Sequence, residues 1–263
     1  MSALPLPAPA ARPRMPDEAT WAALSPDARE RWLDEAQSAL VAEHRRSPEG
    51  RLHRGSKQRA HAALERWFSG MGRRVYLGVE EGVFCPEAEP FCPDLFAVMD
   101  VEDPGPEADR RRWVVREEGR GIDFVLEIIV HGDRRKDLVD NVSFYAALGI
   151  PEYVVYDRKR QKLYGFRLPA PGARRYEPIP LQRGELSSAV LGLGLAIEGQ
   201  HLRFRAAGAT LPEDIELLQR ADRAVEELQG RLDGVEQELE AERQRSAALR
   251  ARLRSAGLDD EPT

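Results

Sequence analysis

Cysteine and long apolar runs are the features that this sequence of 263 residues has least of. Its two cysteines, Cys85 and Cys92, are too few for a disulfide scaffold, and one pair supplies only half of a structural zinc site. No apolar run reaches the ~18 residues that a membrane-spanning helix needs, and the N-terminus lacks the charged-then-apolar pattern of a signal peptide. We therefore expect unreactive thiols in or beside a strand, and a soluble, cytoplasmic protein with no membrane partner.

Net positive charge, a common mark of nucleic-acid-binding proteins, is also lacking, because the formal net charge is −6. The acidic excess lies at one end: from Ala209 onward there are 14 acidic and 8 basic residues, and 8 − 14 accounts for all of the −6. The rest of the chain is neutral and contains two basic clusters, one at 110–112 and one formed by Arg134, Arg135 and Lys136. Both could contact phosphates, and the second is our candidate nucleic-acid-binding site, although solvated loops explain the two clusters about as well.

Composition divides the chain into a core domain and three appendages. Residues 1–24 are rich in proline and alanine, which predicts an extended, disordered tail. Residues 25–208 are enough for one folded domain, which begins with a helix capped by Ser25 and running to about His44. Residues 209–257 predict a long helix, and residues 258–263 predict a second disordered tail.

Apolar residues in the predicted C-terminal helix repeat every seven positions. This pattern, sustained over five repeats, favours a coiled coil and hence a homodimer over a helix packed on its own domain. Gly230, Gly234 and Glu242 weaken the seam. The a positions hold Leu218, Val225, Leu232, Leu239, Ser246 and Leu253, and the d positions hold Ala221, Leu228, Val235, Glu242 and Leu249.

Short apolar runs in the core domain predict an α/β fold. Two central runs, Pro93–Met99 and Asp123–Val130, are apolar enough to be strands buried on both faces. A helix from about Asp137 to Leu148 and a strand at Tyr153–Asp157 make the second run the start of a βαβ unit. The other predicted elements are a helix at Ser56–Met71 and strands at Arg74–Glu80, Trp113–Val115, Lys162–Leu168, Tyr176–Leu181, Leu195–Glu198 and His201–Phe204.

Two carboxylates lie at or inside the central strands. Asp94 follows Pro93 at the mouth of the first run, and Glu127 interrupts the second. Burying an ionised carboxylate costs several kcal/mol unless a cation, a proton or several donors compensate it. Carboxylates from two adjacent strands suit Mg²⁺, which prefers oxygen ligands and retains waters. The alternative for Glu127 is a structural ion pair with one of the many arginines.

Several short motifs, taken together, resemble one known family. They are Pro93-Asp94, Leu126-Glu127-Ile128, Lys136-Asp137-Leu138, and the segment from Tyr145 to Tyr153 followed by Asp157. In this order and spacing they are similar to the Uma-type endonucleases, a bacterial branch of the PD-(D/E)XK nuclease superfamily, over about Arg54 to Arg205. The resemblance implies a restriction-endonuclease-like core with a mixed central sheet flanked by helices. It also implies hydrolysis of phosphodiester bonds in DNA with a divalent metal, Mg²⁺ or Mn²⁺.

The same resemblance implies the roles of individual residues. Asp94 and Glu127 would bind the metal, with the backbone carbonyl of Ile128 as a third ligand. The first core helix would present a polar residue to the metal, here His61 or Glu65, and the favoured alternative for His61 is a capped or surface histidine. Near the end of the strand that follows this helix, Glu80 or Glu81 could extend the set of ligands, without a motif to support either.

The sequence departs from the family where a lysine is expected. The superfamily places it two residues after the acid, where this chain has Ile129, and Uma-type sequences place it in the next helix, where this chain has Asn141. Lys136 lies about 140° from Asn141 on an ideal helix, so it reaches the site only if it projects from a loop before the helix.

We take Asp94, Glu127, Lys136 and Asn141 as the candidate catalytic set. Two functions stay open: a metal-dependent endonuclease, and a catalytically impaired module that binds nucleic acid or assembles through the coiled coil.

Overall fold

The computed structural model describes residues 13–46, 50–103, 105, 110–132 and 134–256. The chain divides into two compact units, Met1–Leu211 and Pro212–Thr263. Within the described residues, no helix is both long enough and apolar enough to cross a membrane.

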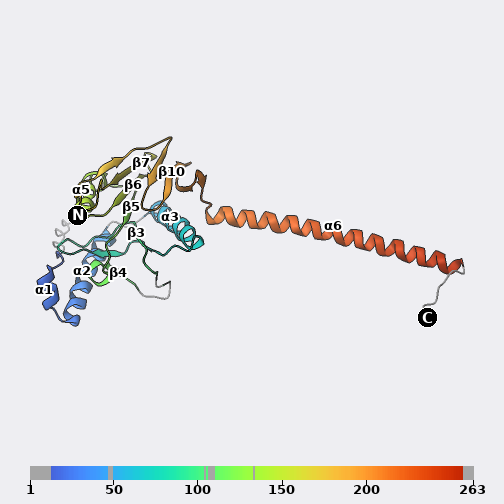
Figure 1. The fold of residues 1–263 in the computed structure, drawn as a ribbon, viewed down its shortest axis with the longest axis horizontal. Coiled ribbons are helices and arrows are strands. Elements are labelled where there is room, and N and C mark those ends of the chain that lie inside the picture. The colour runs from blue at the N-terminus through green and yellow to red at the C-terminus, as the bar shows by residue number, and fades with distance from the viewer. Residues whose placement is uncertain (1–12, 47–49, 104, 106–109, 133, 257–263) are drawn as a thin grey trace, which may run out of the picture. The chain divides into compact units, whose positions relative to one another are not determined.

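A six-stranded mixed sheet forms the centre of the first unit (Figure 1). The strands β5 and β6 are parallel, and every other neighbouring pair is antiparallel. The link between β5 and β6 contains the π-helical turn η1 (Lys136–Asp140) and helix α5 (Asn141–Leu148), which confirms the predicted βαβ unit and the mixed α/β fold. In spatial order the strands are β1 (Val75–Gly78), β3 (Leu95–Met99), β5 (Phe124–Ile129), β6 (Glu152–Asp157), β7 (Lys162–Arg167) and β8 (Glu177–Ile179).

Helices and a second sheet bury both faces of the central sheet. One face, with Leu95 and Leu126, packs against helix α3 (Arg51–Gly70). The opposite face, with Phe96 and Val125, packs against Tyr145 of α5. Because neighbouring residues of a strand point to opposite faces and both faces are covered, β3 and β5 are apolar at almost every position.

Helix α3 begins five residues before its predicted start at Ser56. Gly50, in extended backbone conformation, is its N-cap residue. The Ser56 hydroxyl does not cap a helix; it donates to the Leu52 carbonyl oxygen at 2.8 Å, a contact typical of serine inside a helix. The extra turn brings His53 into the helix.

Two smaller sheets complete the first unit. A four-stranded antiparallel sheet packs its Leu195 and Phe204 into the apolar cluster beneath α3. The sequence predicted only two of its strands, either completing the central sheet or covering one of its edges. In spatial order it contains β12 (Ala209–Thr210), β11 (His201–Ala206), β10 (Leu193–Glu198) and β9 (Glu185–Ser188). The parallel pair β2 (Gly82–Phe84) and β4 (Arg112–Val114) forms the third sheet, and the short helix α4 (Val115–Glu118) follows β4.

The N-terminal region is more ordered than its composition predicts. Residues 13–24 are not an extended tail: they include helix α1 (Glu18–Ala23), and Met15 and Trp21 are buried. The Met15 backbone N–H donates to the Ala88 carbonyl oxygen at 2.8 Å, so these two apolar side chains anchor the segment on the core despite the surrounding prolines. The predicted tails at residues 1–12 and 258–263 lie outside the described residues.

Helix α2 (Pro26–Arg46) begins after Ser25, whose hydroxyl accepts the Ala28 backbone N–H at 3.3 Å. Arg112 pairs with Glu30 and Asp34 of this helix, and Arg110 pairs with Glu118 while its guanidinium lies 4.8 Å from the centre of the Tyr76 ring. Two arginines of the first basic cluster therefore bind other parts of the protein.

The second unit contains helix α6 (Asp214–Ser255), a single helix of 42 residues. Glu213 and Glu216 form a capping box at its start. The large apolar residues at the a and d positions are exposed, from 46% at Leu253 to 61% at Leu228.

Both cysteines are shielded from solvent to different degrees: Cys85 is buried and Cys92 is half-buried. Burial raises the pKa of each thiol to about 12, with negative charges from Glu127, Glu80 and Asp94 contributing at Cys92. At neutral pH such thiols hold their protons and are weak nucleophiles.

Candidate active site

The two candidate metal ligands meet on adjacent strands. In the antiparallel pair of β3 and β5, Leu95 lies opposite Leu126, so the next pair in the same register is Asp94 and Glu127. Asp94 is 7% exposed and Glu127 is 5% exposed. The strand pairing therefore places two buried carboxylates side by side.

Glu127 accepts a hydrogen bond from a tyrosine of the neighbouring helix. The hydroxyl of Tyr145, on α5, donates to Glu127 Oε1 at 2.8 Å. Among the described residues, no arginine forms an ion pair with Glu127, which speaks against the structural alternative. Burial, and then the negative charge of Asp94, raise the pKa of Glu127 well above its ordinary range, and the positive charge of Lys136 partly offsets this effect. A cation bound between the two carboxylates would favour their ionised forms and so oppose this rise in pKa.

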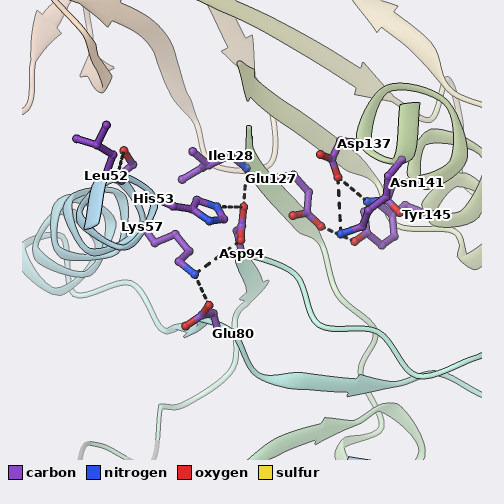
Figure 2. A network of polar contacts seen from close by, with 12 residues as sticks. Leu52, His53, Lys57, Glu80, Asp94, Glu127, Ile128, Asp137, Asn141 and Tyr145 are labelled. Atoms are coloured by element: carbon purple, nitrogen blue, oxygen red, sulfur yellow. Dashed lines mark hydrogen bonds and ion pairs between the residues drawn. The ribbon is translucent and has the colours of Figure 1, made fainter. Parts of the chain in front are cut away.

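Asp94 is held from two sides (Figure 2). Its Oδ2 atom accepts the Ile128 backbone N–H at 2.7 Å and lies 2.8 Å from His53 Nε2. Its Oδ1 atom lies 3.8 Å from the ammonium nitrogen of Lys57, which also pairs with Glu80. The carboxylate plane is thus fixed by β5 and by the first turns of α3.

The sequence did not predict His53 or Lys57 beside Asp94; the polar residue expected from this helix was His61 or Glu65. In the structure His61 lies about two helical turns after His53. Its Nδ1 atom is 3.7 Å from Glu65 Oε2, and neither residue contacts Asp94. One feature of the sequence could have indicated Lys57. Lys57 precedes Ala60 and Leu64 by three and seven residues, which places a lysine on the apolar face of the helix.

The acids after β1 take separate roles. Glu80 pairs with Lys57, beside Asp94. Glu81 instead accepts a hydrogen bond from the Tyr76 hydroxyl, within the apolar cluster on the other face of the sheet. Burial raises the pKa of the Glu81 carboxyl. Of the two, only Glu80 touches the network that includes a candidate metal ligand.

Lys136 and Asn141 lie closer together than an ideal helix allows. Helical structure already begins at Arg134, so Lys136 does not project from a loop as the sequence analysis required. The Asn141 backbone N–H donates to the Lys136 carbonyl, a π-helical bond that places the two residues one wide turn apart rather than 140° apart. Asp137 Oδ1 lies 3.1 Å from Asn141 Nδ2 and 4.0 Å from Lys136 Nζ. Figure 2 shows Asn141 beside Tyr145, on the side of the helix that faces Glu127.

The second basic cluster divides into one internal and two exposed residues. Arg134 Nε lies 2.9 Å from Asp157 Oδ2, and its guanidinium donates to the Tyr164 hydroxyl at 3.1 Å. The side chains of Arg135 and Lys136 are 75% and 66% exposed. Arg134 thus ties the helix to the sheet, and its two neighbours are accessible from solvent.

Two further acids that carry the family resemblance have structural partners. Glu152 accepts hydrogen bonds from the Ser188 hydroxyl and from the Ala189 backbone N–H, so it joins β6 to the second sheet. Asp157 is fully buried and accepts from Arg134 and from the backbone N–H of Arg160.

The donor atoms of Asp94 and Glu127 fit a hard divalent cation. Among the described residues, no group of three or more His, Cys, Asp and Glu side chains could hold a metal ion. Mg²⁺ does not need three such side chains, because it commonly binds one or two carboxylates and fills its other positions with water and substrate phosphate. The pair therefore suits Mg²⁺ better than it suits zinc, which takes three or four protein ligands.

Comparison with known proteins adds independent information. Residues 39–200, more than half of the chain, match the family described as Uma2, putative restriction endonuclease. Among solved structures, the chain is similar to a putative nuclease belonging to DUF820 from Anabaena variabilis, with 13% sequence identity and a TM-score of 0.40. That match covers 55% of this chain and 75% of the other. No curated protein matches the sequence.

Proposed function

Because the chain belongs to the Uma2 family of putative restriction endonucleases, we propose that it is a divalent-metal-dependent endonuclease acting on phosphodiester bonds in DNA. The fold is restriction-endonuclease-like, as the sequence predicted. The observation that carries the proposal is the meeting of Asp94 and Glu127 on adjacent strands, buried, with no described arginine paired to Glu127.

Each residue of the site has a task that follows from its contacts. Asp94 and Glu127 would hold Mg²⁺ or Mn²⁺, and the Ile128 carbonyl is a further candidate ligand. A metal bound there supplies Lewis-acid polarisation of the phosphodiester and lowers the pKa of a bound water. Tyr145 orients Glu127, and the Ile128 N–H orients Asp94. Lys136, whose charge already acts on Glu127, is the candidate for contact with substrate phosphate.

A plasmid-nicking assay with purified protein tests this function directly. We expect conversion of supercoiled DNA to open circles with Mg²⁺ or Mn²⁺, and none when EDTA removes the metal. Isothermal titration calorimetry with Mn²⁺ in the absence of DNA should show one site. Absence of both binding and cleavage would contradict the proposal.

A second function is favoured by one feature of the same site. Ile129 and Asn141 occupy the positions where the resemblance implies a lysine, and neither can carry a positive charge. A nuclease-like module that binds nucleic acid without cutting it would have this site. Metal and DNA binding without nicking would identify that function.

We expect DNA binding to depend on Arg135 and Lys136. The double variant Arg135→Glu/Lys136→Glu should bind DNA more weakly, and the slope of log affinity against log salt should fall by about two, because each lost phosphate contact removes about 0.9 from that slope. Fluorescence anisotropy across a salt series measures both quantities.

The double charge reversal Arg175→Glu/Arg183→Glu is the matched control for that experiment, because both arginines are exposed and the net charge changes by the same amount far along the chain from the helix. Arg134→Glu is a different kind of variant: it removes a partner of the buried Asp157 and should lower the melting temperature instead. Unchanged binding in the double variant would move the DNA site elsewhere.

We also propose that α6 pairs with α6 of a second copy in a parallel coiled coil. Its exposed a and d residues form the apolar seam that such a pair buries. In a parallel pair, Arg231 at g would face Glu236 at e of the partner subunit, and Glu238 at g would face the partner's Arg243. Arg245 would face the partner's Arg250, so two of these three charge pairs attract.

Leu232→Glu should convert the full-length dimer to a monomer, because it places a charge in the middle of the apolar seam. Light scattering after size-exclusion chromatography measures the mass. Gln237→Glu introduces the same charge at an outer f position and should leave the dimer intact. A wild-type protein that is monomeric at tens of micromolar would contradict the coiled coil.

A further inference from the structure

The candidate active site has a cation in a place that the sequence did not indicate. The two positions where a lysine was expected hold Ile129 and Asn141. A lysine instead approaches Asp94 from the other side of the sheet, from position 57 on α3 (Figure 2). Its nitrogen lies 3.8 Å from Asp94 Oδ1.

Lys57 is buried to a degree that is rare for lysine. Its side chain is 1% exposed, and it lies in the helix face that continues into Ala60 and Leu64. An apolar residue of similar length would pack on this face without the desolvation cost of a buried ammonium group, and such replacements are often neutral or stabilising. Stability alone therefore does not account for a lysine here.

The charges around Lys57 differ in their exposure. Glu80 is 35% exposed, so water screens its attraction to the ammonium group. The side chain of Asp94 is 9% exposed, and its other oxygen is already fixed by His53 and by the Ile128 N–H. Lys57 completes the contacts that orient Asp94, and it places a positive charge beside the pair of buried acids.

We propose that Lys57 is a positioning residue of the candidate active site: from α3 it holds Asp94 in orientation and provides the positive charge that positions 129 and 141 lack. This inference rests on the proposed metal-dependent cleavage. Because the ammonium group and a bound metal would act on the same carboxylate, Lys57 also weakens metal binding. Loss of the lysine should therefore have opposite effects on binding and on cleavage.

Lys57→Met separates this role from a merely structural ion pair. We expect the variant to bind Mn²⁺ about tenfold more tightly, because a like charge beside the metal is removed. Single-turnover cleavage at saturating Mn²⁺ should fall about 100-fold, the scale of losing one preorganised electrostatic contact. Calorimetry measures the first quantity and a plasmid-nicking time course the second.

Two control variants sharpen the comparison. Glu80→Gln removes the other partner of Lys57 and leaves Lys57 beside Asp94, so any loss of cleavage should be much smaller than the loss in Lys57→Met. Lys57→Arg keeps the charge and should recover part of the cleavage that Lys57→Met loses. If the lysine served only its ion pair with Glu80, Glu80→Gln and Lys57→Met would behave alike.

A measurement on the wild-type protein covers the case in which Lys57→Met does not fold. The chain has four lysines, Lys57, Lys136, Lys159 and Lys162, so lysine-selective isotope labelling gives a simple NMR spectrum. Addition of Mg²⁺ should shift the side-chain signal of Lys57 and leave those of the exposed Lys159 and Lys162 in place. An unshifted Lys57 signal at saturating Mg²⁺ would overturn the inference.

The outcomes distinguish this inference from the proposed function. If neither wild type nor variant binds Mn²⁺, the metal site is wrong and the role of Lys57 is wrong with it. If wild type binds and cleaves, and folded Lys57→Met binds no more tightly or cleaves as fast, only the inference about Lys57 is overturned.

Discussion

Glu127→Gln is expected to abolish metal binding and to lower DNA cleavage by about 10³-fold or more, since a bound metal contributes several kcal/mol to the transition state. Glutamine has nearly the same shape and keeps a carbonyl oxygen that can accept the Tyr145 hydroxyl. It lacks the negative charge that, with Asp94, would hold the cation. Calorimetry with Mn²⁺ and the plasmid-nicking assay measure the two effects.

The same variant should stabilise the metal-free protein, most strongly at alkaline pH. In the folded wild type the pKa of Glu127 is raised by burial and by Asp94, so the folded state binds this proton more tightly than the unfolded state. The stability linked to this group is fully present below the ordinary glutamate pKa of about 4.3 and is lost as pH rises through the raised value. Glutamine does not ionise, so its melting-temperature advantage over wild type should be larger at pH 8 than at pH 5.

Glu152→Gln is the matched control, because Glu152 is a buried acid on the strand next to β5. Its partners are Ser188 and Ala189 rather than the site, so its replacement should leave Mn²⁺ binding unchanged. If Glu127 were instead part of a structural ion pair, metal-free Glu127→Gln would be less stable than wild type rather than more stable. Removing one member of such a pair costs roughly 3 to 5 kcal/mol, and a loss of that size in metal-free Glu127→Gln would exclude the metal site.

The central part of the fold was predictable from local sequence. The runs that became β3 and β5 are apolar at consecutive positions, which only a strand covered on both faces explains. Within such a run an acid such as Glu127 stands out, since its burial needs a reason that packing does not provide. The strand register then follows from burial, and it places Asp94 opposite Glu127.

The residues that surround the two carboxylates were not predictable by the same reasoning. His53 and Lys57 meet Asp94 across about 40 residues of sequence, and no periodic pattern records that contact. Helix α3 also begins five residues before its predicted start at Ser56, so His53 lay outside the predicted helix. The π-helical turn at Lys136–Asp140 changed which residues share a face, and a rule of 100° per residue does not include such a turn.

The heptad repeat of α6 shows a different limit of local sequence. The period predicts the helix and its apolar stripe, and the structure has both, with Leu228 61% exposed in the single chain. The pairing proposed for α6 involves a second molecule, and the local pattern predicts the stripe but not its partner. The Leu232→Glu variant is needed for that reason.

Asn141→Lys is expected to raise the cleavage rate by about 100-fold, the lower end of the range for a well-placed catalytic group. Asn141 lies one helical turn before Tyr145, whose hydroxyl reaches Glu127, so a lysine at 141 would extend along the same side of the helix. Its charge would join that of Lys136, which already acts on Glu127. Single-turnover nicking with saturating Mn²⁺ measures the rate.

Asn141→Gln is the control for that substitution, because it lengthens the side chain without adding charge and should leave the rate near that of wild type. The double variant Lys57→Met/Asn141→Lys tests whether a positive charge can support cleavage from either side of the carboxylate pair. If Lys57 provides it from α3, a lysine at 141 should restore most of the cleavage that Lys57→Met loses. If wild type binds metal but neither it nor Asn141→Lys cuts DNA, the site has lost more than a cation, and the protein would be a nucleic-acid-binding module built on a nuclease fold.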